Sequence, residues 1–177
     1  QLEDLDEYPH LIFKLAYANF SIGSLANAQY YFSELLNTES KYAGPAQYYS
    51  AYIAYQNSLY KTALDGFKKL ITNEQFRSIV PYYITQIYFF QKSYKELIVF
   101  SSPLIEDVIP SRKAEVNRLL GESYYRTQDY NNAIIHFNAY LEERKQVNPI
   151  LHFLMGQSYF KINEYELSLI HISEPTR

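Results

Sequence analysis

The chain has 177 residues and a formal net charge of −3, with 20 Tyr, 11 Phe, no Trp and no Cys. The absence of cysteine excludes disulfides and thiolate metal sites within these residues. The slightly acidic balance and the lack of a Lys/Arg run argue against nucleic-acid binding, which needs a basic stripe. No apolar run approaches the ~18–20 residues of a membrane-spanning helix, so we expect no membrane insertion in this segment.

A short apolar pattern returns about every 35 residues. A Leu or Tyr, an Ala three residues later and a Phe four residues beyond recur in LANAQYYF (25–32), LYKTALDGF (59–67) and DYNNAIIHF (129–137). With a weaker copy between them, the central positions are 28, 63, 97 and 133. Such a period is typical of stacked supersecondary units. It predicts units at residues 9–43, 44–77, 78–113 and 114–148, and a partial unit at 149–166.

Each unit is predicted to contain two amphipathic helices. In residues 114–148, apolar residues first recur at three- and four-residue spacing up to Tyr124, RTQDY interrupts, and the helical period resumes from Ala133. Small residues are expected where the two helices cross, and a Phe is expected to fill the space toward the next unit. Prolines, which suit the first turn of a helix, lie at or near the expected start of a first helix. They are Pro9, Pro45, Pro81 and Pro149.

The unit at residues 78–113 departs from this pattern. Thr85 takes the place of the small residue, Leu97 that of the Ala and Ser101 that of the Phe. The SSP sequence at 101–103 predicts that the second helix of this unit is shifted or starts late.

These motifs resemble those of tetratricopeptide repeat (TPR) proteins. The resemblance covers residues 9–166 and is best in the fourth unit, through Leu120, Gly121, Tyr124, Tyr130, Ala133 and Phe137. It implies an all-α fold, a right-handed α-solenoid of helix-turn-helix repeats with about four full repeats and a partial fifth. The Tyr-rich style is similar to that of large bacterial cell-envelope TPR proteins, which favours the envelope or periplasm over the cytoplasm.

The end of the chain does not continue the pattern. Residues 167–177, LSLIHISEPTR, resemble the translation of a sequencing adapter and are expected to be a non-native tail. Ser168 suits the small position of a fifth repeat, but Ile172 and Pro175 suit it poorly. An array that ends within a repeat leaves apolar faces exposed, so self-association through this end is expected.

No group of residues predicts catalysis, a cofactor or a metal site. The histidines His10, His136, His152 and His171 have no second ligand at helical metal spacing, and His136 is expected to be surface-exposed or half-buried. There is no phosphate-binding Gly-rich loop and no nucleophile motif. We therefore expect a non-enzymatic protein.

The resemblance implies a concave groove lined by the first helix of each unit. Mapping the inward positions of these helices gives a Tyr-rich half and a charged half. The predicted partner-binding residues are Phe13, Tyr17, Tyr48, Tyr52, Tyr82, Gln86, Arg118 and Glu122. Ordinary packing between repeats is the alternative role for the aromatic residues. A third row of Phe20, Tyr55, Phe89, Tyr125 and Phe160 is expected to be mainly packing.

The leading functional hypothesis is a protein-interaction scaffold, part of a longer protein, that binds a peptide or a partner helix in this groove. One alternative is a recruiting or regulatory arm of an enzyme that lies outside these residues. The other is an RNA-binding helical repeat array, against which the net charge of −3 argues.

Overall fold

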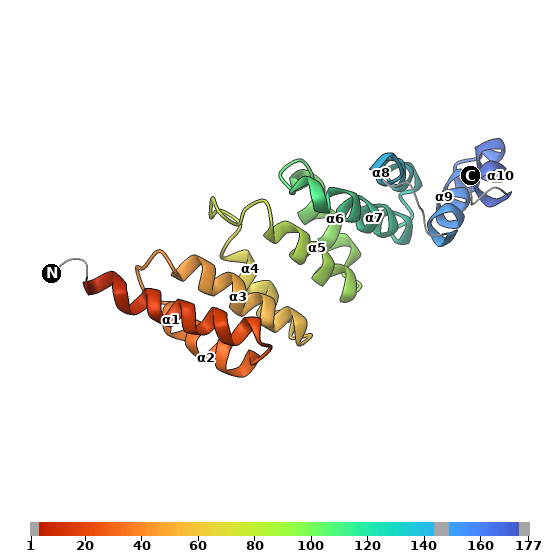
Figure 1. The fold of residues 1–177 in the computed structure, drawn as a ribbon. Helices are drawn as coiled ribbons and strands as arrows, with labels where there is room; N and C mark the ends of the chain where they lie inside the picture. The colour runs from red at the N-terminus through yellow and green to blue at the C-terminus, as the bar shows by residue number, and fades with distance from the viewer. Residues whose placement is uncertain (1–3, 144–148, 174–177) are drawn as a thin grey trace. The chain divides into compact units, whose positions relative to one another are not determined.

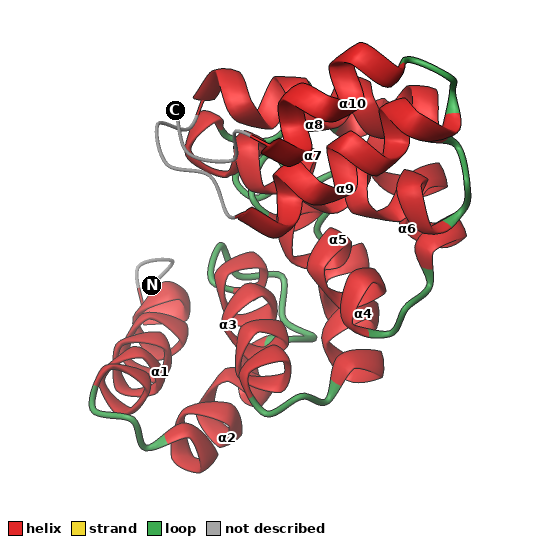
Figure 2. Ribbon diagram, turned by 90° about the vertical axis from the view of Figure 1, so that its right-hand side faces the viewer, coloured by secondary structure: helices red, strands yellow, loops and turns green. Residues whose placement is uncertain are grey.

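The computed structural model describes residues 4–143 and 149–173, which form helices joined by turns and short loops, with no strand in these ranges (Figures 1 and 2). The elements are α1 (Asp4–Ser21), α2 (Leu25–Leu35), α3 (Ala43–Gln56), α4 (Tyr60–Lys68), α5 (Val80–Phe90), α6 (Tyr94–Ser101), the 3₁₀ helix η1 (Ser102–Leu104), α7 (Pro110–Arg126), α8 (Tyr130–Glu143), α9 (Pro149–Lys161) and α10 (Tyr165–Ser173).

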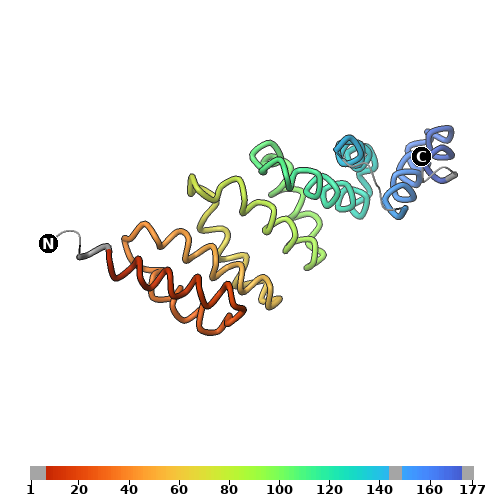
Figure 3. The backbone as a smooth tube through the Cα atoms, viewed as in Figure 1, coloured from red at the N-terminus to blue at the C-terminus, as the bar shows by residue number. Residues whose placement is uncertain are grey.

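The chain divides into two compact units, residues 1–80 and 81–177, and each is described by itself. In the first unit α1 packs on α2, α2 on α3 and α3 on α4, so each helix contacts its neighbour in the chain (Figure 3). In the second unit the same holds from α6 through α10. This nearest-neighbour packing is that of a helical repeat protein.

The helices of the first, second and fourth hairpins have buried small residues at the predicted crossing positions, whereas the third has Thr85 and Leu97 there. Ala16 and Ala28 are fully buried in the first hairpin, and Ala51 and Ala63 are 2% and 0% exposed in the second. Phe32, Phe67 and Phe137 are also fully buried. A Cβ added at Gly121 would lie 2.5 Å from the Phe137 ring, so this glycine allows the close approach of α7 and α8.

Every hairpin turn uses one residue in the left-handed backbone region, two positions before the second helix. These residues are Gly23, Ser58, Lys92, Gln128 and Asn163, with φ between 57° and 78°. The next amide donates to a carbonyl five residues earlier, as from Leu59 to Ala54 and from Asp129 to Tyr124, both at 2.9 Å. This is the Schellman arrangement, which satisfies the last carbonyls of the first helix.

The prediction of a shifted or late second helix in the third hairpin is wrong. Helix α6 begins in register at Tyr94 and instead ends early, at Ser101. Pro103 has no N–H to continue the helix and enters η1 at its start. The Thr85 hydroxyl donates its proton to the Pro81 carbonyl, so Ser101, which stands in place of Phe, donates the 2.7 Å hydrogen bond to Thr85 Oγ1.

Three of the four prolines predicted to mark the start of a first helix do lie in the first turn of one. Pro149 opens α9, and Pro45 and Pro81 lie in the first turns of α3 and α5. Pro9 lies inside α1, because this helix begins at Asp4, five residues before the predicted start of the unit.

Helix α10 crosses residue 166 without a break, up to Ser173, and residues 174–177 lie outside the described residues. Ser168 is buried at the small position, and Ile172 occupies the position equivalent to Phe137, where its side chain packs against Gly156. The structure thus fits Ile172 into the repeat better than its sequence suggested. The non-native origin of residues 167–177 stays a prediction.

Gly121→Ala tests the close crossing of α7 and α8. A helical Gly→Ala change usually stabilises by roughly 1 kcal/mol. Here we expect a loss of about 1–3 kcal/mol, because the new methyl group displaces the Phe137 ring. Urea unfolding, with hydrogen exchange of α7 and α8, measures the change, and the exposed Asn138→Ala serves as a control. A more stable variant would contradict this account.

His136 makes the stability of the second unit depend on pH. Its Nδ1 lies 2.8 Å from Asn117 Oδ1, its ring stacks on Tyr124 at 5.4 Å, and burial lowers its pKa. Because the unfolded pKa is about 6.5, the unfolded state binds more protons just below that pH, so stability falls as pH falls through 6.5.

We therefore expect His136→Gln to flatten the dependence of the free energy of unfolding between pH 7.5 and 5.5. Burial and the neighbouring His152 also lower the pKa of His171, which adds a dependence of the same sign. The variant should thus reduce the slope without removing it. An unchanged slope in urea titrations at each pH would show that His136 is not the group responsible.

Candidate functional site

Helix α1 carries a row of three aromatic residues on one face. Phe13, Tyr17 and Phe20 are spaced four and three residues apart, which places them on the same side of the helix. The ring centroids of Phe13 and Tyr17 are 6.4 Å apart, and those of Tyr17 and Phe20 are 6.3 Å apart.

Helix α3 adds three tyrosines to this row. Tyr48 and Tyr52 stack at 6.3 Å with nearly parallel rings, and Tyr52 lies 5.9 Å from Phe20. Tyr49 lies between the two helices, 5.4 Å from Tyr17 and 5.0 Å from Phe20. We call this set the aromatic face: Phe13, Tyr17, Phe20, Tyr48, Tyr49 and Tyr52.

Sequence reasoning missed Tyr49, whose ring connects the aromatic residues of α1 to those of α3. Tyr49 stacks on the buried Phe32 at 5.3 Å and also meets Phe13 at 6.3 Å. Its position in the repeat is not aromatic on α1, where Lys14 stands, so a search for rows at a fixed period passed over it. The three-residue spacing of Tyr49 and Tyr52 places both on the same side of α3, and this spacing was the feature of the sequence that could have identified Tyr49.

The aromatic face combines a packed base with accessible rings. Tyr17 is 46% exposed, whereas its neighbours are half-buried. Burial raises the pKa of Tyr49, and the charge and hydroxyl of Tyr17 raise it further. Tyr49 is therefore neutral at physiological pH. Tyr48 is held by parallel stacking on Phe76, 5.0 Å away.

The other four predicted residues lie in the second unit, where Tyr82 is largely a packing residue. Tyr82 is only 8% exposed, and the Arg112 guanidinium lies 4.7 Å from the centre of its ring. Gln86 Nε2 donates to the Tyr82 hydroxyl at 2.9 Å. Burial, the largest effect, raises the pKa of Tyr82 although the charge of Arg112 opposes it.

Arg118 and Glu122 form an ion cluster with Glu115 on α7. The Arg118 guanidinium binds Glu115 with two hydrogen bonds, of 3.0 and 2.7 Å, and also contacts Glu122. Burial by itself would lower the pKa of Arg118, but the two carboxylates outweigh it and raise the pKa. These charges are largely satisfied within one helix, so a partner would have to compete with them.

The eight predicted residues divide equally between the two units. Phe13, Tyr17, Tyr48 and Tyr52 are brought together in the first unit, and Tyr82, Gln86, Arg118 and Glu122 belong to the second. Among the described residues no group of three or more His, Cys, Asp or Glu is placed to hold a metal ion. Within the same ranges, none of the helices combines the length and apolar character needed to cross a membrane.

Comparison with known proteins identifies the fold. No family model matches the sequence, and no curated protein matches it. Among solved structures, MamA (41–end) of Desulfovibrio magneticus RS-1 is similar over 95% of this chain and 93% of its own, with 17% identity and a TM-score of 0.73. YrrB, described as a TPR protein with an unusual peptide-binding site, matches over 92% and 81%, with 17% identity and a TM-score of 0.75.

A third structure, TTC0263 of Thermus thermophilus, a thermophilic TPR protein, matches over 94% of this chain and 89% of its own, with 15% identity and a TM-score of 0.51. Together with the helical structure, these similarities confirm the predicted all-α repeat fold of the TPR type.

Tyr49 is expected to be the structural centre of the aromatic face. Tyr49→Ala should cost about 2–3 kcal/mol, because it leaves a cavity against Phe32 and Phe20. Tyr17→Ala removes an exposed ring and should cost less than about 1 kcal/mol. Urea unfolding of both variants measures the difference. Equal losses of unfolding free energy would mean that the two rings contribute equally to stability and would contradict a central role for Tyr49.

Proposed function

Taking the TPR-type fold as the premise, we propose that this chain is a protein-interaction module that binds a peptide or a partner helix on the aromatic face. Its role in this proposal is recruitment or scaffolding, without catalysis by these residues. Helical repeats suit this role because their stacked first helices present an extended surface.

The observation that supports the proposal is the unbroken series of ring contacts across α1 and α3. Tyr17, Tyr49, Phe20, Tyr52 and Tyr48 follow one another at centroid separations of 5.0–6.3 Å. Tyrosine rings lose little conformational entropy on binding and combine apolar area with a hydrogen-bonding hydroxyl, which is why they are enriched in interfaces. A surface of this kind suits apolar side chains of a partner more than its charges.

The character of this face also separates the proposal from nucleic-acid binding. Its six members carry no positive charge, whereas phosphate recognition needs several basic groups. YrrB, whose description includes an unusual peptide-binding site, provides a precedent for peptide binding on this fold.

A peptide-display selection against the 177-residue protein would test the proposal. Selected peptides should bind the Tyr17→Ala/Tyr52→Ala variant at least about tenfold more weakly, as is typical when aromatic anchors are removed. Tyr30→Ala, which removes a ring of α2 that is 62% exposed and outside the aromatic face, should leave the affinity unchanged. Circular dichroism would confirm that each variant is folded.

Binding on this face should also depend only weakly on salt, because it carries few charges. Equal affinity of the selected peptides for wild type and the double variant would refute the proposal. So would steep salt dependence of the kind seen with nucleic acids.

A further inference from the structure

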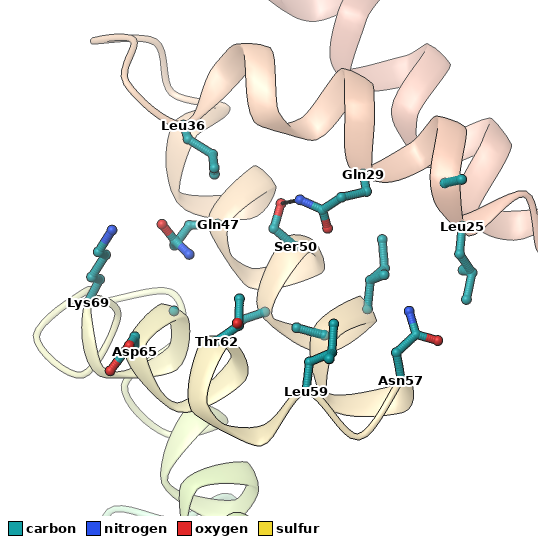
Figure 4. Close-up of a pocket in the computed structure, with 15 residues that line it drawn as sticks. Leu25, Gln29, Leu36, Gln47, Ser50, Asn57, Leu59, Thr62, Asp65 and Lys69 are labelled. Atoms are coloured by element: carbon teal, nitrogen blue, oxygen red, sulfur yellow. Dashed lines mark hydrogen bonds between the residues drawn. The ribbon is translucent and has the colours of Figure 1, made fainter.

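A cavity of about 620 Å³ opens in the first unit, between α2 and α4 and above α3 (Figure 4). Its lining includes Leu25 of α2, Leu36 directly after that helix, Leu59 and Thr62, together with Ala51 and Ala54 of α3. The volume lies in the range of small-ligand sites, about 300–1,000 Å³. None of its lining residues belongs to the aromatic face.

A comparison with the other hairpins shows which aromatic side chains the second hairpin lacks at this cavity. Three residues after the crossing position, the second helices carry Tyr31, Phe100, His136 and His171. At the same position α4 has Gly66. The matching residue of the first helix is Tyr88, Tyr124 or Tyr159 in the later hairpins, and Ala54 in α3.

In the later hairpins these two positions hold a pair of rings in contact. Tyr88 meets Phe100 at 6.0 Å, Tyr124 meets His136 at 5.4 Å, and Tyr159 meets His171 at 5.3 Å. The second hairpin has Ala54 and Gly66 instead, and both line the cavity. The cavity therefore lies where the three later hairpins place an aromatic pair.

A polar residue beside the cavity also has a counterpart in the fourth hairpin. His136 makes a 2.8 Å hydrogen bond with Asn117, four residues before the crossing position of α7. The matching residue of α3 is Gln47, which also lines the cavity. A Cβ added at Gly66 would lie 2.8 Å from Ala51 Cβ and 3.0 Å from Gln47 Nε2, so α4 packs closely on α3 at this position.

We propose that this cavity accepts an aromatic side chain of a partner polypeptide, which takes the place of the ring pair missing from the second hairpin. Small residues at Ala51, Ala54 and Gly66 provide an apolar base, and Gln47 provides an amide for the edge or hydroxyl of the ring.

The rim of the cavity favours a polypeptide over a free aromatic molecule. Asn57, Asp65 and Lys69 are exposed and border the apolar base, so they can form hydrogen bonds with the backbone on either side of the inserted residue. Gln29 and Ser50 are joined to each other, with Gln29 Nε2 donating to Ser50 Oγ at 3.3 Å (Figure 4). The site is independent of the aromatic face and would operate beside it.

The test uses four probes with isotope-labelled protein: nine-residue Gly/Ser peptides with a central Tyr, Leu or Ala, and phenol alone. We expect the Tyr peptide to shift the amide resonances of residues 47–57 and 62–69, and to bind at least about tenfold more tightly than the other three probes. Equal binding of the Leu peptide would remove the requirement for a ring. Binding of phenol as tight as that of the Tyr peptide would show a small-molecule site, and either result overturns the proposal.

Ala54→Tyr rebuilds the first-helix ring and fills the cavity, so it should weaken the Tyr peptide at least about tenfold. Gln56→Tyr adds the same ring at an exposed position of α3 outside the cavity, so it should leave binding of the Tyr peptide unchanged. If circular dichroism shows that Ala54→Tyr is not folded, Thr62→Tyr is used in its place, because a ring at this position of α4 closes the opening of the cavity. Unchanged binding by a folded blocking variant overturns the proposal, whatever the outcome for the aromatic face.

Discussion

The close crossing of two helices at small residues is the constraint on which the hairpins other than that of α5 and α6 depend. Where Ala16 meets Ala28, and where Gly121 meets Ala133, neither helix has a side chain that would hold the backbones apart. That approach brings a buried phenylalanine of the second helix against the first, as Phe137 lies against Gly121. The positions around the crossing then determine whether the neighbouring space is filled or open.

This constraint explains why the sequence predicted the fold well and the surfaces less well. The crossing residues and Phe32, Phe67 and Phe137 recur at a fixed spacing, so their pattern was visible without structure. The turns were less visible, because the left-handed position holds Ser58, Lys92 or Gln128 in addition to the expected Gly and Asn. The backbone hydrogen bonds of the turn, and not one residue type, select this conformation.

The repeat pattern of the sequence also predicted the two candidate sites incompletely. Four of the predicted groove residues lie in the first unit, where the rings of Phe20 and Tyr49 connect the pair on α1 to the pair on α3, and Tyr49 lies outside the periodic rows. The cavity arises from residues that are small where the other repeats are aromatic. A comparison of the repeats with one another at Ala54 and Gly66 could have found this difference in the sequence, whereas the volume and the polar rim require the structure.

The hairpin of α5 and α6 differs from the others in its contacts, and this difference bears on how the chain responds to force. A hydroxyl pair, Thr85 and Ser101, stands where a phenyl ring packs in other hairpins, and α6 is shortened by Pro103. Two hydroxyls bury less apolar area than a phenyl ring, so we expect this hairpin to open more easily than those that contain Phe32, Phe67 and Phe137. A chain under tension is then expected to open there before those three hairpins, so that it lengthens while the aromatic face and the cavity of residues 1–80 stay folded.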